Sequence, residues 1–330
     1  MRIALDAMGT DHAPATEIAG AVQAVTDLDD IEVVLVGDRA QIEAGLSESE
    51  HDPARIHVHH APDRILPSDP PASVVRRKPR SSIVEGVRLH KEGEVDAFVS
   101  AGSTGAVMAA SLFILRALPG VDRPSVATPL PTAGAPTILL DSGTNVDCKP
   151  RHLHQFAHLG RVYARDILEV EEPRIGLLNI GEEPGKGDER AVETFELLQA
   201  DPQLRFVGNV EGREIIRGVC DVLVADGFVG NVLLKFYESV AQFIIGLLQE
   251  EVEKSGAELD LHRTFRALDY SEYGGAPLLG VDGVSIICHG GSTPKAIRNA
   301  LQVASQGVRS NMVKDMADAL ADVRKEGNPS

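Results

Sequence analysis

The chain has 330 residues, which is enough for one large α/β domain or two closely joined lobes. Its 43% apolar content is typical of a globular protein, and a net charge of −17 argues against nucleic acid as a partner. We find no run of 18 uninterrupted apolar residues, and the chain enters a strand directly after Met1, so we expect neither a spanning helix nor a signal peptide. Three widely spaced cysteines indicate free thiols in a reducing cytoplasm.

Strand-like and helix-like segments alternate along the whole chain. Apolar runs predict strands over 2–6, 31–36, 56–60, 137–141, 174–180, 219–224 and 283–288, with further strands beginning near 96 and 205. Helical spacing predicts helices over 16–25, 39–46, 82–91, 105–118, 152–168, 189–199 and 232–248, and from 294 onward. This alternation favours a single α/β domain over 1–330, with a largely parallel, doubly wound sheet between two helical layers. Ligands of such a sheet lie beyond the carboxyl ends of its strands.

A long apolar helix interrupts this alternation. It is apolar over a wide arc from Phe236 to Val252, and a second helical stretch follows to about Leu268. We expect a protruding helical hairpin over about 236–270 that is buried in the core or in a dimer. A lipid-facing surface is the alternative, and acidic residues such as Glu250 and Glu258 disfavour it because they would repel anionic lipid.

Two strand-turn-helix segments share the same spacing of glycines. Gly102 and Gly105 follow one strand at the offsets at which Gly227 and Gly230 follow another. A glycine-rich turn of this kind directs backbone N–H groups at whatever lies above the strand end, and that favours anions. The pair therefore suggests two walls of one phosphate-sized crevice, although ordinary turns that need glycine would look the same.

Polar side chains at the expected strand ends are mostly amides, hydroxyls and ammonium groups, which suit a small anion and a developing oxyanion. They indicate group transfer that involves phosphate. The motifs of zinc sites and of nucleotide binding are missing, and His57, His59 and His60 are interpreted as surface residues, so we expect no metal and no cofactor. A basic cluster of Arg76, Arg77, Lys78 and Arg80 stands out on so acidic a chain and suggests docking of an acidic or phosphorylated partner.

Several blocks of sequence resemble the bacterial phosphate acyltransferases of phospholipid synthesis, the PlsX family. The resemblance covers essentially the whole chain, in order, and rests on residues 2–14, 75–82, 99–106, 176–181, 208–211 and 226–231. It implies an enzyme that makes acyl phosphate from long-chain acyl-[acyl-carrier-protein] and inorganic phosphate, reversibly. It also implies a homodimer with a fold similar to phosphotransacetylases and to isocitrate/isopropylmalate dehydrogenases. The product would pass to a membrane glycerol-3-phosphate acyltransferase, and the enzyme would be cytoplasmic or peripheral at the inner face of the membrane.

A direct attack of phosphate on the thioester follows as a hypothesis, because phosphate is already anionic and a thiol is a good leaving group. In this hypothesis Lys186 steadies the phosphate, Asn231 positions it or polarises the thioester carbonyl, and His12 protonates the departing thiolate. The four basic residues above would receive the carrier protein. Further phosphate or substrate contacts are expected from Gly102, Ser103, Thr104, Gly105, Asn145, Asn179, Asn209, Asp226, Gly230 and Lys235.

Two other functions remain open from the residues. An NAD-dependent dehydrogenase of the isocitrate/isopropylmalate type shares the expected fold, but it would need a metal held by clustered aspartates and a nucleotide contact. A non-catalytic scaffold that binds acyl carrier protein is the second alternative. The convergent polar turns disfavour it, because binding of the carrier protein alone does not require them.

Overall fold

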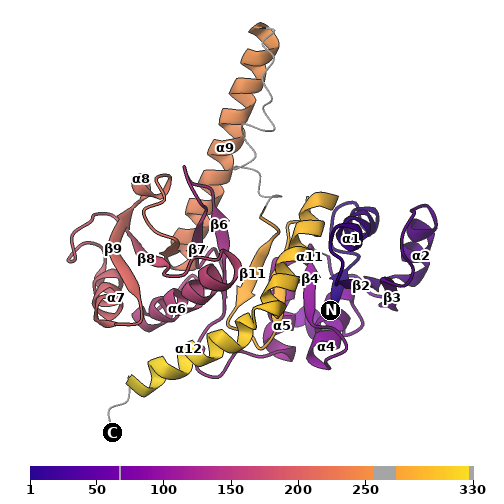
Figure 1. Cartoon of the computed structure of the whole chain (residues 1–330), viewed down its shortest axis with the longest axis horizontal. Helices are drawn as coiled ribbons and strands as arrows, with labels where there is room; N and C mark the ends of the chain where they lie inside the picture. The colour runs from indigo at the N-terminus through magenta and orange to yellow at the C-terminus, as the bar shows by residue number, and fades with distance from the viewer. Residues whose placement is uncertain (67, 256–272, 327–330) are drawn as a thin grey trace. The chain divides into compact units, whose positions relative to one another are not determined.

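The structure, a computed structural model, describes residues 1–66, 68–255 and 273–326. Its elements are labelled in Figure 1. The chain forms two compact units where the sequence suggests one domain. Unit 1 comprises Met1–Pro124, Asp166–Glu169 and Tyr273–Ser330, and unit 2 comprises Ser125–Arg165 and Val170–Glu272. Each unit has its own mainly parallel strands and its own helices.

Unit 1 contains a sheet in the strand order β3-β2-β1-β4-β12-β11, parallel except for the antiparallel pair β11–β12. Its strands are β1 (Arg2–Asp6), β2 (Glu32–Gly37), β3 (Ile56–His60), β4 (Ala97–Ser100), β11 (Ala276–Leu279) and β12 (Val284–Ile287). Its helices are α1 (Ala15–Asp27), α2 (Arg39–Ser47), α3 (Pro71–Arg77), α4 (Ser82–Lys91), α5 (Thr104–Ile114), α11 (Pro294–Arg309) and α12 (Met312–Glu326). Residues 3–6 and all of β4 are buried, as expected of central strands covered on both faces.

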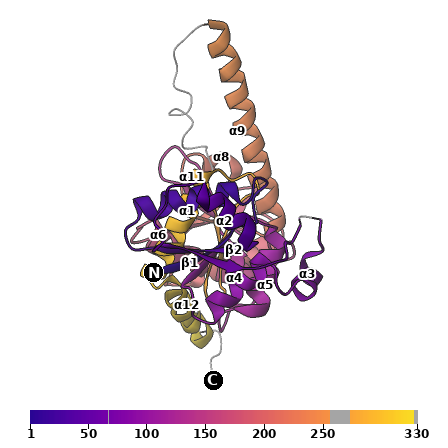
Figure 2. The same cartoon turned by 90° about the vertical axis from the view of Figure 1, so that its right-hand side faces the viewer.

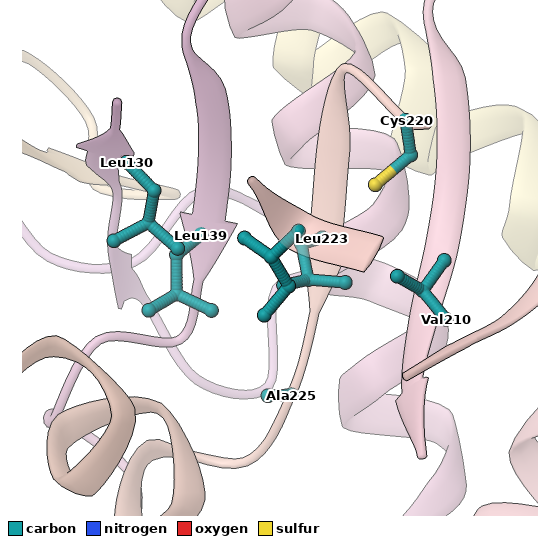
Figure 3. Close-up of a cluster of buried hydrophobic side chains, with 7 residues drawn as sticks. Leu130, Leu139, Val210, Cys220, Leu223 and Ala225 are labelled. Atoms are coloured by element: carbon teal, nitrogen blue, oxygen red, sulfur yellow. The ribbon is translucent and has the colours of Figure 1, made fainter. Parts of the chain in front are cut away.

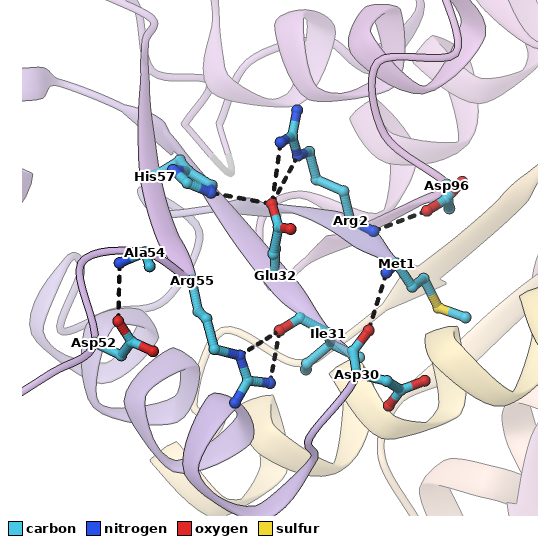
Figure 4. Close-up of polar contacts among 10 residues, drawn as sticks. All are labelled: Met1, Arg2, Asp30, Ile31, Glu32, Asp52, Ala54, Arg55, His57 and Asp96. Atoms are coloured by element: carbon cyan, nitrogen blue, oxygen red, sulfur yellow. Dashed lines mark hydrogen bonds and ion pairs between the residues drawn. The ribbon is translucent and has the colours of Figure 1, made fainter.

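Helices α1 and α11 pack against each other, and α3 packs against α5 (Figure 2). The amino-terminal edge of the sheet is closed by polar contacts, drawn in Figure 4. There Glu32 accepts hydrogen bonds from Arg2 and from the imidazole of His57, both at 3.0–3.1 Å. These two contacts hold the pKa of Glu32 below its usual value. The side chain of His57, which we expect at the surface, is half-buried and is paired with Glu32.

Unit 2 contains a second sheet in the order β6-β7-β10-β8-β9, parallel except for the antiparallel pair β6–β7. The strands of this sheet are β6 (Thr128–Leu130), β7 (Thr137–Leu140), β8 (Arg174–Asn179), β9 (Arg205–Glu211) and β10 (Val222–Val224). The short strand β5 (Ser125–Val126) of unit 2 is not one of them. Its helices are α6 (Pro150–Ile167), α7 (Glu189–Ala200), α8 (Gly212–Ile215) and α9 (Gly227–Ser255). One face of the sheet carries the apolar cluster of Figure 3, which includes Leu130, Leu139 and Leu223.

Helix α9 extends well beyond the strands of unit 2 (Figure 1, orange). Its first turns pack on the cluster of Figure 3 through Leu233 and Leu234, and the Tyr237 hydroxyl donates to the Pro131 carbonyl. By length and composition, Gly227–Glu250 is the one helical segment among the described residues that meets the requirements for crossing a membrane, and no residue of its apolar 18-residue window is buried. This segment contains no unbroken apolar run of 18 residues, because Lys235 and Glu238 interrupt it.

The structure confirms the expected parallel α/β architecture and corrects several details. Strands β5, β6 and β11 were not anticipated, because they are only two to four residues long. Helix α9 begins at Gly227 and not at Val232, so Gly230 and Asn231 lie in its first turn. The second arm of the expected hairpin over 236–270 lies outside the described residues from 256 onward.

Candidate active site

The turn between β10 and α9 is organised by Asp226, which is buried. One carboxylate oxygen of Asp226 accepts hydrogen bonds from the N–H groups of Phe228 and Val229 at 3.0 and 3.1 Å. The other oxygen lies 3.0 Å from an Arg190 guanidinium nitrogen. Asp226 thus caps the helix and holds α7 against it, and neither of its carboxylate oxygens is left without a partner.

Asn145 and Gly230 bind this turn to the loop after β7. The buried carboxylate of Asp141 accepts from the Asn145 backbone N–H at 2.5 Å and from its side-chain amide at 3.0 Å. The Asn145 carbonyl in turn accepts from the N–H of Gly227 at 2.8 Å. A Cβ at Gly230 would lie only 1.9 Å from the Asp141 carbonyl oxygen. Asn145 and Gly230 therefore hold the two loops together, and the contact requires glycine at position 230.

Asn231 is exposed directly above this junction. Its side chain lies against Gly143, where an added Cβ would come 3.2 Å from the Asn231 amide oxygen. Gly143 has a φ of +139°, a backbone conformation that favours glycine. The backbone N–H groups of residues 227–230 are all bonded, that of Gly227 to Asn145 and the others to Asp226. The side chain of Asn231, and not the backbone of this turn, is thus what α9 can offer an anion.

The loop that carries Lys186 is held by two amides from neighbouring strand ends. Asn179 donates to the Lys186 carbonyl at 3.0 Å, and Asn209 donates to the Glu183 carbonyl at 2.8 Å. Asn209 is buried, and its amide oxygen has no hydrogen-bond partner in the structure. The ammonium group of Lys186 is half-exposed, with the Glu183 carboxylate 3.9 Å away. Asn179 and Asn209 therefore position the loop, and Lys186 is free to reach a ligand.

Lys235, one turn further along α9, forms an exposed ion pair with Glu238 at 2.9 Å. Among the described residues, no hydrogen bond or ion pair joins it to the Lys186 loop. The structure thus groups Asn145, Asp226, Gly230 and Asn231 at one junction, and Asn179, Asn209 and Lys186 at a second. Arg190 links the two, because its guanidinium contacts both Asp226 and, at 3.2 Å, Asp188 at the end of the loop.

In unit 1, the turn from Gly102 to Gly105 leads from β4 into α5. Ser103 occupies the N-cap position without a side-chain cap, and the N–H groups of Thr104 and Gly105 have no acceptor among the described residues. This turn therefore keeps the free donors that the sequence attributes to both turns. Buried Asp6 braces it, since Asp6 accepts from Ser100 at 2.6 Å and the Ser100 hydroxyl accepts from the Gly102 N–H at 3.0 Å.

His12 and the basic cluster also belong to unit 1. His12 is exposed in the loop between β1 and α1, and its backbone carbonyl accepts from Ala15 at 3.1 Å. Arg76, Arg77 and Arg80 are exposed on and after α3, and the Arg76 guanidinium lies 5.2 Å from the centre of the Phe113 ring. Lys78 differs from its neighbours because it bonds Asp69 at 2.7 Å and the Arg64 carbonyl at 2.9 Å.

Sequence reasoning missed Asp141 and Arg190, which bind the loops together. Asp141 stands directly after an apolar strand, and that position was its signal. Arg190 lies in a helix among many charged residues and had no signal. A cluster of His154, His158 and Asp201 in unit 2 was also missed, because Asp201 is distant in the sequence from the two histidines.

Three comparisons with known proteins agree on the kind of protein. Among solved structures, a phosphotransacetylase from Streptococcus pyogenes superposes with a TM-score of 0.65 at 16% identity, covering 94% of each chain. EutD phosphotransacetylase from Staphylococcus aureus gives 0.64 at 15% identity, covering 93% of this chain and 94% of the other. The protein is therefore an α/β protein with the fold of these phosphotransacetylases.

The family follows from the sequence matches. A family model described as "Fatty acid synthesis protein" matches residues 1–315. The phosphate acyltransferase of Desulforamulus reducens is 48% identical over 327 residues, 97% of each chain, and that of Dictyoglomus thermophilum is 43% identical over 99% of this chain and all of its own. The chain belongs to this family of fatty acid synthesis proteins, as the resemblance in the sequence implies. The dehydrogenase alternative is not favoured, because likeness in fold alone does not carry an activity.

Proposed function

We propose that the chain forms acyl phosphate from long-chain acyl-[acyl-carrier-protein] and inorganic phosphate, reversibly, as a step of phospholipid biosynthesis. Membership of a family whose curated relatives are phosphate acyltransferases carries this proposal. Features of each unit support it, because the uncapped N–H groups of unit 1 and the exposed lysine and amide of unit 2 are each suited to a phosphate or to an oxyanion.

The acyl group passes directly from sulfur to phosphate in this proposal. A phosphate oxygen attacks the thioester carbonyl carbon, the C–O bond forms, and the C–S bond breaks to release a thiolate that takes up a proton. All three cysteines are buried, and burial raises the pKa of the Cys220 and Cys288 thiols to about 12. They are therefore poor nucleophiles, which supports direct transfer without an acyl-cysteine intermediate.

Individual residues take the following roles. Lys186 neutralises phosphate and the developing charge, Asn231 polarises the carbonyl or positions phosphate, and the turn from Gly102 to Gly105 donates backbone N–H groups to an anion. His12 protonates the leaving thiolate. Asn145, Asn179, Asn209, Asp226 and Gly230 act by holding the loops, and Lys235 is a second contact for phosphate.

The partners follow from the same chemistry. Exposed Arg76, Arg77 and Arg80 receive the acidic carrier protein, whereas Lys78 holds the loop before α3 through Asp69. The enzyme works as a homodimer in the cytoplasm or at the inner face of the membrane, where a glycerol-3-phosphate acyltransferase consumes the acyl phosphate.

The decisive experiment measures acyl phosphate formed from palmitoyl-acyl carrier protein and phosphate, in parallel with palmitoyl-coenzyme A. Lys186→Ala is expected to lower kcat/KM at least about 100-fold, because a preorganised charge at the reacting group is lost. Lys254→Ala is the matched control, since Lys254 is an exposed lysine of α9 paired with Glu250. Turnover with coenzyme A alone would instead indicate a phosphotransacetylase, and carrier-protein binding without turnover by folded protein would indicate a scaffold.

A further inference from the structure

Three side chains of unit 2, two buried and one partly buried, converge on one point away from the loops of the candidate active site. His154 and His158 are one turn apart on the same face of α6, and Asp201 follows the last residue of α7. One oxygen of the Asp201 carboxylate lies 2.7 Å from Nε2 of His154 and 2.8 Å from Nε2 of His158. The possible ligand atoms of all three residues lie within 4.8 Å of one another.

The cluster is sheltered and its geometry is fixed. The side chains of His154, His158 and Asp201 are 13%, 0% and 6% exposed. The second oxygen of Asp201 accepts from the Gln203 backbone N–H at 2.8 Å, which orients the carboxylate. Nδ1 of His158 has no hydrogen-bond partner among the described residues, so the hydrogen bonding of this ring there is directed at the cluster. The two rings stand edge to face, with their centres 5.0 Å apart.

We propose that His154, His158 and Asp201 bind a divalent transition-metal ion, Zn²⁺ before others. Two imidazole nitrogens and one carboxylate oxygen are ligands that Zn²⁺ takes in proteins, with water as a fourth. Ca²⁺ and Mg²⁺ fit less well, because they rely on more oxygen ligands. Zinc needs bonds of about 2.0–2.2 Å, so the Asp201 oxygen moves away from each imidazole nitrogen by a fraction of an ångström when the ion enters between them.

The place of the cluster in the fold assigns it a structural role. Strands β7, β10, β8 and β9 are parallel, and the loops with Lys186 and Asn231 follow the carboxyl ends of β8 and β10. Asp201 precedes β9 and therefore lies at the opposite, amino-terminal edge of the sheet. A bound ion would join the middle of α6 to the α7–β9 connection without touching the candidate active site.

The test uses the full-length protein, stripped of metal by a chelator and titrated with Zn²⁺ alone. We expect one equivalent to bind and the Tm to rise with the Zn²⁺ concentration, because the ion binds the folded state. Co²⁺ should give the visible absorption of a four-coordinate site. In His154→Gln and Asp201→Asn, the affinity for Zn²⁺ should fall at least about 100-fold. Loss of a metal ligand should lower the affinity at least as much as loss of a residue that only hydrogen-bonds a ligand.

His57→Gln is the matched control, because His57 also meets a carboxylate, Glu32, at 3.1 Å but without a second imidazole. Its affinity for Zn²⁺ should equal that of the unaltered protein. The two ligand variants leave fully buried His158 in place, so they are expected to fold, and their circular dichroism checks this. Failure of the unaltered protein to bind one equivalent, or equal binding by folded His154→Gln and Asp201→Asn, would overturn the proposal.

Discussion

Glu17 is a fully buried carboxyl group in the first turn of α1. Burial raises its pKa to about 7, even though Thr10 donates to it from its backbone N–H at 2.6 Å and from its hydroxyl at 3.0 Å. The nearby Asp6 carboxyl raises the pKa of Glu17 further. The Glu17 carboxyl group is therefore neutral in the folded protein below about pH 7, because ionisation in this buried position costs free energy.

This shift predicts how stability depends on pH. The pKa of Glu17 in the folded protein lies above the ordinary 4.5, so the folded state binds this proton more tightly than the unfolded state does. The protonated Glu17 therefore stabilises the folded state, and this contribution is complete below about pH 4.5. This stabilisation is lost as the pH rises through about 7, and the free energy of unfolding falls by about 3 kcal/mol over that range. Glu17→Gln should flatten the pH dependence of the free energy of unfolding between pH 5 and 7, roughly the interval between the two pKa values. Urea titrations at several pH values measure it, and an unchanged slope in Glu17→Gln would contradict the assignment.

Asn209 tests the positioning of the Lys186 loop. Asn209→Leu leaves the Glu183 carbonyl without its donor, which should cost about 1 kcal/mol of stability and lower kcat/KM about tenfold. Steady-state kinetics with varied phosphate measure the loss. Asn299→Ala in α11, a change in unit 1, is the control. A variant that loses stability but keeps full activity would show that the loop does not need this amide.

At the scale of elements, the start of α9 depends on a close contact with the loop after β7. Gly230→Ala would place a methyl group 1.9 Å from the Asp141 carbonyl oxygen. The backbone at Asp141 would have to move to relieve this clash, at a considerable cost in free energy. We expect a loss of about 3 kcal/mol and of most activity, because the first turn and Asn231 must move. Gly246→Ala in the same helix meets no atom within 4 Å and should stabilise the protein by about 0.5–1 kcal/mol. Thermal unfolding compares the two variants, and equal effects would rule out the contact.

At the scale of the whole molecule, α9 carries an apolar stripe that the described residues leave open. Phe236 and Phe243 are each 66% exposed, and Val240 and Leu247 lie on the same face of the helix. Contiguous apolar surface of this kind marks an interface, and the expected homodimer would cover it. Sedimentation should give the mass of two chains for the unaltered protein and of one chain for Phe236→Glu/Phe243→Glu.

Gln242→Glu adds a charge on the other side of α9 and is the control for this prediction. It should leave the dimer intact. A single-chain mass for the unaltered protein would contradict the dimer, and binding of the monomer to anionic lipid vesicles through the stripe would indicate a membrane surface instead.

The amino-acid sequence was sufficient to predict the α/β class, most strands and helices, the family, and the candidate residues at strand ends. It could do so because buried parallel strands are continuous apolar runs, and because polar turns follow them in order along the chain. The pattern also located Lys186, Asn179 and Asn209 in polar segments, but it assigned the two asparagines to the ligand and not to the loop.

Only the tertiary structure decided which polar groups are already engaged. Asp221 and Gly227 match Asp96 and Gly102 in spacing, yet the N–H groups of residues 227–230 are all bonded, whereas those of Thr104 and Gly105 have no acceptor among the described residues. Asp201 lies 43 residues from His158 in the sequence but 2.8 Å away in space. Hydrogen bonds and ion pairs act over a few ångströms, whereas spacing along the chain reports only local geometry. Partners brought together by folding therefore had no signal in the sequence.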